Sequence, residues 1–182
     1  MPELHLEKSK PCAYLPEQQS ANLVFWENKV KVEDWDELVA SGWRHFGNLF
    51  FRPNCQSCNK CQGIRVSVAY FKESKSQRRV IQKAKELTTQ VLDHPPKDAL
   101  DLLNAFQRER HETLGWPLEE YSQAELESSF VGTFAFSRCL AVYKESELVA
   151  FSCFDLGKKT LNSIYAVCSP KYRNLSLGTF LA

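Results

Sequence analysis

The chain has 182 residues, 43% of them hydrophobic and 12% aromatic, and a formal net charge of +1. This length and composition fit one large domain or two small ones with an apolar core, and they argue against a mainly disordered chain. The first ten residues lack the apolar stretch of a signal peptide and no apolar run approaches the ~18 residues of a membrane span, which predicts a cytoplasmic location without a membrane partner.

The first part of the chain predicts extended segments, one helix and one hairpin. Residues 1–21 show no helical period. A helix is expected over 33–41, where apolar residues share one face and Gly42 supplies the stop. Residues 43–51 (WRHFGNLFF) predict a β-hairpin around a Gly-Asn turn, and after a cysteine-rich loop a strand is expected over 64–71 (IRVSVAYF).

The middle of the chain predicts two helices with a strand between them. A basic helix is expected within 74–87 (SKSQRRVIQKAKEL), followed by a strand at 88–92. Asp98 is placed to cap a second helix that runs to about Leu114, with Gly115 as its stop and three apolar residues turned inward: Leu102, Leu103 and Phe106.

The last part of the chain changes to a β pattern. Residues 122–125 (SQAE) have the spacing of a capping box for a short helix. Three strands of an antiparallel meander follow: 138–143, 148–154 and 161–167. Ser176 is then expected to cap a final short helix. This order predicts an α+β fold and also fits an N-acyltransferase-like architecture, in which the meander leads to a loop and helix that bind the acyl donor. Because so short a helix buries little, we expect residues beyond Ala182 or a partner to complete its packing.

Cysteine spacing predicts a metal site. With no secretion signal, the seven cysteines are expected to be reduced. Cys55, Cys58 and Cys61 form a C-x2-C-x2-C run, and Cys12 is the natural fourth ligand because both zinc and iron–sulfur clusters take four. Soft thiolates suit both, so spacing does not separate Zn²⁺ from an iron–sulfur cluster. The remaining cysteines fall in expected strands and fit buried core positions: Cys139, Cys153 and Cys168.

Three other interpretations of the cysteine run compete with the metal site. A thioredoxin-like pair would need a βαβ setting, which this segment lacks. A ferredoxin-type run usually continues to a nearby Cys-Pro, which is absent here. Core cysteines would not explain three thiols in seven residues of a polar loop. We therefore favour four thiolates around one metal centre.

Positive charge is concentrated in one segment. Between positions 52 and 85 nine basic residues accompany one acid, Glu73, which gives +8 and leaves −7 for the rest of a chain of net +1. Such a field attracts a polyanion, although solvated helix faces also carry charge runs. Tyr70 and Phe71 would stack on an unpaired base if they are exposed, or pack in the core if they are not. Phosphate-binding side chains gather in six positions: Ser74, Ser76, Gln77, Arg78 and Arg79.

Five segments in order resemble landmarks of the aminoacyl-tRNA–protein transferases. They are PCAYLP, RPNCQSCNKCQGIRVSV, SKSQRR, the pair Arg110–His111, and SIYAVCSPKYRNLSLGTF. The three-cysteine loop and the CxYLP start resemble the bacterial leucyl branch more than the eukaryotic arginyl branch. The chain departs from the family at Glu73, where a proline is usual, and family members continue past the last helix.

This resemblance implies a small cysteine-rich N-terminal lobe at 1–68 and a GNAT-like acyltransferase domain at 69–182 that is incomplete at its C-terminus. It implies an enzyme that moves an amino acid, leucine in preference to arginine, from charged tRNA to the N-terminal α-amine of proteins that begin with Asp or Glu. The product would be marked for degradation. No CoA is expected.

The reaction implied is aminolysis of the aminoacyl ester, with the terminal ribose hydroxyl as leaving group. The last helix would offer backbone N–H groups to the acceptor end of the tRNA from Ser176, Leu177, Gly178 and Thr179. Phosphates or the acidic acceptor side chain would bind to Arg65, Ser74, Ser76, Gln77, Arg78 and Arg79. Proton-transfer candidates are His111, Asp155 and Tyr165, although a packing role fits each of them as well.

Two alternatives remain open at this level. A CoA-dependent N-acetyltransferase of the same fold would need a glycine-rich Q/R-x-x-G-x-G/A loop, whereas RNLSLGT has a single glycine. A non-catalytic metal-ribbon module that binds RNA would explain the cysteines and the charge, but not the meander and the terminal helix.

Overall fold

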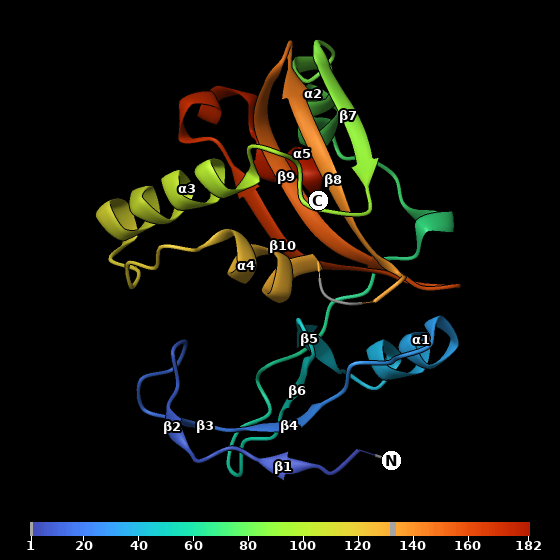
Figure 1. The fold of residues 1–182 in the computed structure, drawn as a ribbon, viewed down its shortest axis with the longest axis vertical. Coiled ribbons are helices and arrows are strands. Elements are labelled where there is room, and N and C mark those ends of the chain that lie inside the picture. The colour runs from blue at the N-terminus through green and yellow to red at the C-terminus, as the bar shows by residue number, and fades with distance from the viewer. Residues whose placement is uncertain (1, 132–133) are drawn as a thin grey trace.

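The computed structural model describes residues 2–131 and 134–182 and contains two four-stranded antiparallel sheets (Figure 1). The N-terminal sheet has strand order β1-β4-β6-β5. Its strands are β1 (His5–Leu6), β4 (Asn22–Trp26), β5 (Arg44–Phe46) and β6 (Leu49–Pro53). A separate two-stranded ladder is formed by β2 (Lys10–Pro11) and β3 (Gln19–Ser20), and helix α1 spans Val32–Ala40.

The predicted helix and hairpin of the N-terminal part are confirmed. Helix α1 buries Trp35 and ends before Gly42, whose left-handed φ of +87° favours glycine. Strands β5 and β6 pair across a turn at Gly47, where φ is +54°. A Cβ atom at Gly47 would collide with the carbonyl oxygen of Ser128, so the hairpin turn docks closely onto a later part of the chain.

The second sheet contains the predicted meander and one further strand. Its order is β10-β9-β8-β7, and every neighbouring pair is antiparallel. The strands are β7 (Leu87–Leu92), β8 (Ser137–Lys144), β9 (Glu147–Leu156) and β10 (Leu161–Cys168). Strand β9 is buried over most of its length and forms the centre of the core. This mixed architecture with antiparallel sheets agrees with the predicted α+β class.

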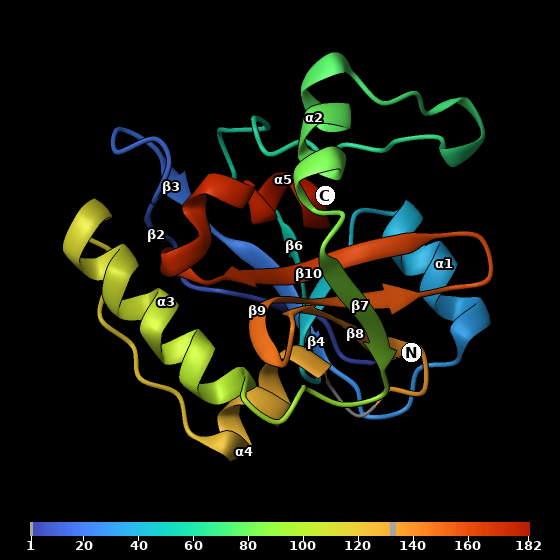
Figure 2. The same ribbon diagram turned by 90° about the horizontal axis from the view of Figure 1, so that it is seen from above.

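Helices cover both faces of the second sheet (Figure 2). One face carries α3 (Ala99–Leu114), α4 (Gln123–Leu126) and the π-helical turn η2 (Glu127–Val131). The other carries α5 (Leu177–Leu181), which follows the 3₁₀ helix η3 and lies beside α2. Helix η3 comprises Pro170–Leu175, and α2 comprises Lys75–Lys83. Among the helices of residues 2–131 and 134–182, none is long and apolar enough to cross a membrane.

The strand predicted over 64–71 is wrong. This segment is irregular and contains only the short 3₁₀ helix η1 (Val68–Tyr70). Its apolar side chains face solvent, with Ile64 90% and Tyr70 85% exposed. A strand requires a neighbouring edge to pair its backbone N–H and C=O groups, and in the described part of the chain this segment pairs with none of the sheet edges. Alternation of apolar residues alone did not make a strand.

Helix capping follows the sequence where the cap is purely local. Ser74 and Gln77 form a reciprocal capping box at α2, and 122–125 forms the predicted one at α4. Asp98 precedes α3 but its side chain makes no capping hydrogen bond, and α3 ends as predicted at Gly115. Ser176 precedes α5 in a left-handed conformation, also without a side-chain cap, so that prediction is only partly correct.

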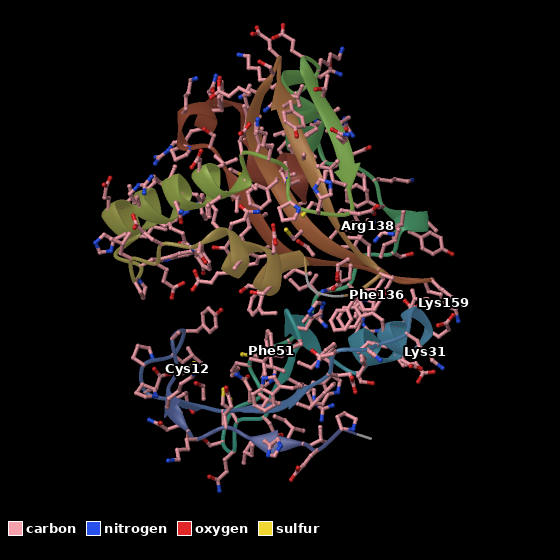
Figure 3. All side chains as sticks on the ribbon, in the orientation of Figure 1. Cys12, Lys31, Phe51, Phe136, Arg138 and Lys159 are labelled. Atoms are coloured by element: carbon pink, nitrogen blue, oxygen red, sulfur yellow. The ribbon has the colours of Figure 1, made fainter. Side chains whose placement is uncertain are left out.

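A buried aromatic cluster joins the two sheets. Trp35 of α1 stacks on Phe136, which precedes β8, with ring centroids 5.4 Å apart. Phe50 of β6 meets Phe134 edge-on at 5.6 Å. Figure 3 shows Phe136 beside α1 and close to Lys159 of the turn between β9 and β10. The N-terminal sheet is therefore packed directly against the second one.

Asp36 adds a polar link at this junction. Its carboxylate accepts hydrogen bonds from the backbone N–H groups of Lys158 (3.0 Å) and Lys159 (3.1 Å) and from the hydroxyl of Thr160 (2.6 Å). The Thr160 hydroxyl, followed by the backbone donors, holds the pKa of Asp36 below its usual 3.8. A carboxylate with a lowered pKa in the folded state stabilises the fold above pH 3.8, and this contribution is lost as the pH falls through the lower folded value.

We expect Asp36→Asn to reduce the free energy of unfolding by about 1 kcal/mol at pH 7, because an amide nitrogen would face backbone donors. The deficit relative to the parent should shrink as the pH falls below 3.8. Urea unfolding at neutral and acidic pH measures both effects. Glu37→Gln, exposed on the same helix, is the matched control. An equal deficit at both pH values would contradict the role of the carboxylate charge.

Candidate functional site

A groove of about 380 Å³ lies between the C-terminal half of α3 and the segment that joins β10 to α5. Arg110 lines it from α3, and Ser176 and Gly178 line it from the opposite wall. Leu177 also borders the groove, but its side chain is buried against the second sheet. Thr179 lies in the first turn of α5, with its N–H bonded to Ser176 O at 3.0 Å. Three of the four residues predicted here therefore border one groove.

Two carboxylates hold the groove wall formed by η3. Glu147 of β9 accepts hydrogen bonds from the Tyr172 hydroxyl (2.6 Å) and from Lys171 Nζ (2.9 Å), and these donors lower the pKa of Glu147 from its ordinary value. Glu109 of α3 forms an ion pair with Arg173. Because η3 is tied to both the sheet and α3, this wall is preorganised.

The predicted phosphate-binding residues at 74–79 divide into two groups. Ser74 Oγ accepts the N–H of Gln77 at 3.2 Å, and Gln77 Oε1 accepts the N–H of Ser74 at 2.8 Å. Ser76 Oγ lies 2.9 Å from Ser74 Oγ. These three side chains start helix α2. Arg78 and Arg79 instead line a surface hollow of about 480 Å³ that also includes Lys75, Gln82 and Lys83.

Helix α2 lies against the segment that leads into α5. Lys83 Nζ donates to the carbonyl of Asn174 at 3.1 Å, and Figure 2 shows α2 and α5 side by side. The structure thus brings the two predicted groups of binding residues to neighbouring helices. Arg65 is separate from both, since its guanidinium donates to the carbonyl of Ala40 (2.5 Å) at the end of α1.

Asp155 has a place in the junction of the sheets. It is fully buried, its Oδ2 lies 2.9 Å from His45 Nε2, and its Oδ1 accepts the hydroxyl of Ser137 at 2.8 Å. Both carboxylate oxygens are therefore occupied by protein groups away from solvent. This arrangement fits the packing role considered for Asp155, and the sequence offered no sign of its partner His45.

The other proton-transfer candidates flank α3 without meeting each other. His111 Nδ1 lies 2.7 Å from the carbonyl oxygen of Trp116, which holds the ring at the end of the helix. The Tyr165 hydroxyl accepts a hydrogen bond from Gln107 Nε2 at 3.3 Å. Burial raises the pKa of Tyr165, so its phenol stays protonated near neutral pH. The structure does not assemble a catalytic pair from these residues.

Family comparisons agree with this arrangement. The N-terminal model of arginine-tRNA-protein transferases matches residues 10–79, and the C-terminal model matches residues 98–182. The chain belongs to the aminoacyl-tRNA–protein transferase family. Two relatives, both named aspartate/glutamate leucyltransferase, come from Vibrio campbellii and Campylobacter jejuni. The first is 33% identical over 96% of this chain and 74% of its own length, and the second is 31% identical over 93% and 72%.

The features of this transferase fall in both matched regions. The cysteine loop and the basic helix α2 begin within the first, and the groove lies within the second. The sequence missed the surroundings of Arg110, which packs against aromatic rings. The sequence pointed to Arg110 only through the Arg110–His111 landmark. The contacts of Arg110 could not be predicted, because they depend on how α3 packs against the loop that follows it.

The four cysteines predicted as ligands line one cavity of about 800 Å³ in the N-terminal part. Cys12 comes from the loop between β2 and β3, and the other three come from the loop after β6; Figure 3 marks Cys12 and Phe51, which both border this cavity. Within the described residues, no three His, Cys, Asp or Glu side chains stand close enough to share an ion. As predicted for core positions, Cys139 and Cys153 are buried, whereas Cys168 is only partly so.

Salt dependence tests whether α2 holds tRNA. About four phosphate contacts to unpaired RNA would weaken tRNA binding roughly 50-fold between 50 and 200 mM salt. Replacing both Arg78 and Arg79 by alanine should reduce the slope of log K against log salt by about 1.4. Filter binding of tRNA at several salt concentrations gives this slope. The double variant Lys29→Ala, Lys31→Ala removes the same charge from exposed positions near α1 and should leave the slope unchanged. An unchanged slope in the arginine variant would contradict the assignment.

Proposed function

We propose that this transferase moves leucine from leucyl-tRNA to the α-amine of proteins that begin with aspartate or glutamate, and that the product is marked for degradation in the cytoplasm. The observation that carries the proposal is the family match over both parts of the chain, together with relatives named for leucyl transfer to these two residues. The cationic helix beside a groove supports it, because tRNA and an acidic acceptor are both anionic.

The reaction needs little covalent chemistry from the protein. The neutral α-amine of the acceptor attacks the carbonyl carbon of the aminoacyl ester, and the terminal ribose hydroxyl leaves with a proton. Because the ester is already activated, positioning of the two substrates supplies most of the rate enhancement. Arg78 and Arg79 hold phosphates on one side of α5, and the groove on its other side receives the reacting ends. Tyr165 lies beside α3 as a protonated hydroxyl.

The same proposal includes a GNAT-like fold for residues 69–182, preceded by a cysteine-rich lobe at 1–68. Support comes from the β8–β9–β10 meander that leads through η3 into α5. A CoA-dependent activity is not favoured, since RNLSLGT has one glycine where a pyrophosphate loop has several. The acyl donor is therefore tRNA.

Incubation of the chain with labelled leucyl-tRNA and a peptide that begins with Asp or Glu should transfer leucine to the peptide. Arginyl-tRNA should react much more slowly, and the same peptide with an acetylated N-terminus should not react because its nitrogen is no longer nucleophilic. Mass spectrometry of the peptide identifies the added residue. Transfer of arginine alone would overturn the donor assignment, and no transfer from either tRNA would overturn the function.

We further propose that Cys12, Cys55, Cys58 and Cys61 hold a soft metal centre, either Zn²⁺ or an iron–sulfur cluster. Four thiols on the wall of one cavity match the donor set that either centre needs. Since no three of the described candidate ligands share an ion position, the loop after β6 would have to move toward Cys12 to close the site. When bound, the centre would pin the two loops and take no part in aminolysis.

Protein purified without oxygen should carry about one zinc ion or one cluster per chain, as shown by elemental analysis and visible absorbance. Cys58→Ser should lower the metal content severalfold. Cys168→Ser is the matched control, because Cys168 lies in β10 away from the cysteine cavity. Wild-type protein that contains no metal after such purification would contradict the proposal.

A further inference from the structure

The guanidinium group of Arg110 is fixed by aromatic rings. Its Cζ atom lies 4.7 Å from the ring centroid of Phe106, one turn earlier in α3, and 5.8 Å from that of Trp116, just after the helix. Such cation–π contacts orient a guanidinium without using its N–H donors. Arg110 therefore meets the groove with a defined orientation.

One donor of Arg110, its Nε–H group, is not satisfied by the neighbouring carboxylate. Its Nε atom is buried and has no hydrogen-bond partner among the described residues. The Glu109 carboxylate lies 3.7 Å from this nitrogen, beyond hydrogen-bond distance, and is engaged by Arg173 and by the hydroxyl of Thr113 (3.2 Å). A buried N–H group without a partner is costly in a protein interior, and here it leaves the guanidinium without a hydrogen bond to the protein on that edge.

The charge of Arg110 also acts on the sheet side of the groove. Burial raises the pKa values of Tyr165 and Cys168, and the positive charge of Arg110 opposes both increases. The groove thus combines apolar walls with one oriented cation close to β10. A volume of about 380 Å³ is at the lower end of small-ligand pockets and suits one or two amino-acid residues.

We propose that Arg110 determines acceptor specificity by binding the side-chain carboxylate of the N-terminal Asp or Glu. The proposal rests on the proposed function and assigns one residue to its selectivity. A planar guanidinium matches a carboxylate with two parallel hydrogen bonds, whereas a neutral Asn or Gln would bring no negative charge to it. The Arg110 side chain is 36% exposed and its Nε atom is buried, so the guanidinium is partly desolvated and a site built around it disfavours the uncharged isostere. The leucine side chain of the donor is apolar and would not bind a guanidinium group.

A phosphate of the tRNA end is the competing occupant. The neighbouring Glu109 disfavours it, because a polyanion would bring further negative charge toward that carboxylate, whereas a single Asp or Glu side chain brings one. Phosphate contacts also have a separate cationic surface on α2.

The test uses two peptide amides that differ only in their first residue, Asp or Asn, titrated calorimetrically into the chain without tRNA. The parent should bind the Asp peptide on the order of 30-fold more tightly than the Asn peptide. Arg110→Gln should remove this preference, and Arg110→Lys should keep part of it because the charge remains. The matched control is Arg108→Gln in the same helix, whose side chain is 51% exposed and pairs with Glu120 at 3.2 Å; it should keep the full preference.

Leucyl-tRNA binding and leucine transfer are measured in parallel. Arg110→Gln should leave tRNA affinity unchanged while the kcat/KM for the Asp peptide falls on the order of 30-fold. Loss of tRNA affinity with an intact preference for Asp would assign the groove to phosphate and overturn the proposal, as would a parent that binds both peptides equally. Because peptide binding needs no tRNA, absence of leucine transfer with a clear Asp preference would overturn the proposed function but support the role of Arg110.

Discussion

The buried contact between His45 and Asp155 fixes how the two sheets meet. His45 Nδ1 lies 2.8 Å from the carbonyl of Gly47, which only accepts, so this nitrogen carries a proton; Nε2 and the Asp155 carboxylate then share a second one at 2.9 Å. The pair is neutral overall wherever that proton resides, and Ser137 satisfies the remaining oxygen at 2.8 Å. Removing either partner would leave a buried charge or an unpaired polar atom, at a cost of about 3–5 kcal/mol. Aromatic rings that surround the pair exclude water and strengthen it.

The cysteine-lined cavity and the groove lie on different sides of this junction. The cysteine cavity is formed by residues between 12 and 61, whereas the groove is formed by residues between 106 and 178. Figure 1 shows the N-terminal sheet at the opposite end of the molecule from η3 and α2, and the two cavities have no lining residue in common. This separation supports a stabilising role in the N-terminal part for the proposed metal centre.

The sequence correctly predicted elements that depend on neighbouring residues in the chain. It failed for features that depend on contacts between residues far apart in the chain. The capping box at Ser74 and the stop at Gly115 depend on neighbours within a few residues, and both were correct. Residues 64–71 alternate like a strand, but a strand also needs a free edge, which no local pattern specifies. The sequence left Asp155 open between proton transfer and packing, because its partner His45 is 110 residues away. The groove is formed by α3 and the β10–α5 segment. The sequence identified several of its residues, but it could not predict that these two segments lie next to each other.

The two proposed substrates, tRNA and an acidic N-terminus, are both anionic, and the charge distribution would direct them to different parts of the molecule. The segment from 52 to 85 has nine basic residues and one acid, an excess that suits a polyanion and is sensitive to salt. In the groove, Arg110 and Arg173 lie close to Glu109, so the net positive charge there is small and attracts a polyanion only weakly. A single carboxylate gains there from an oriented, partly desolvated guanidinium, where screening by salt is weaker. With α5 between the two regions, the proposed arrangement would attract the tRNA backbone to α2 and leave Arg110 available to the acceptor side chain.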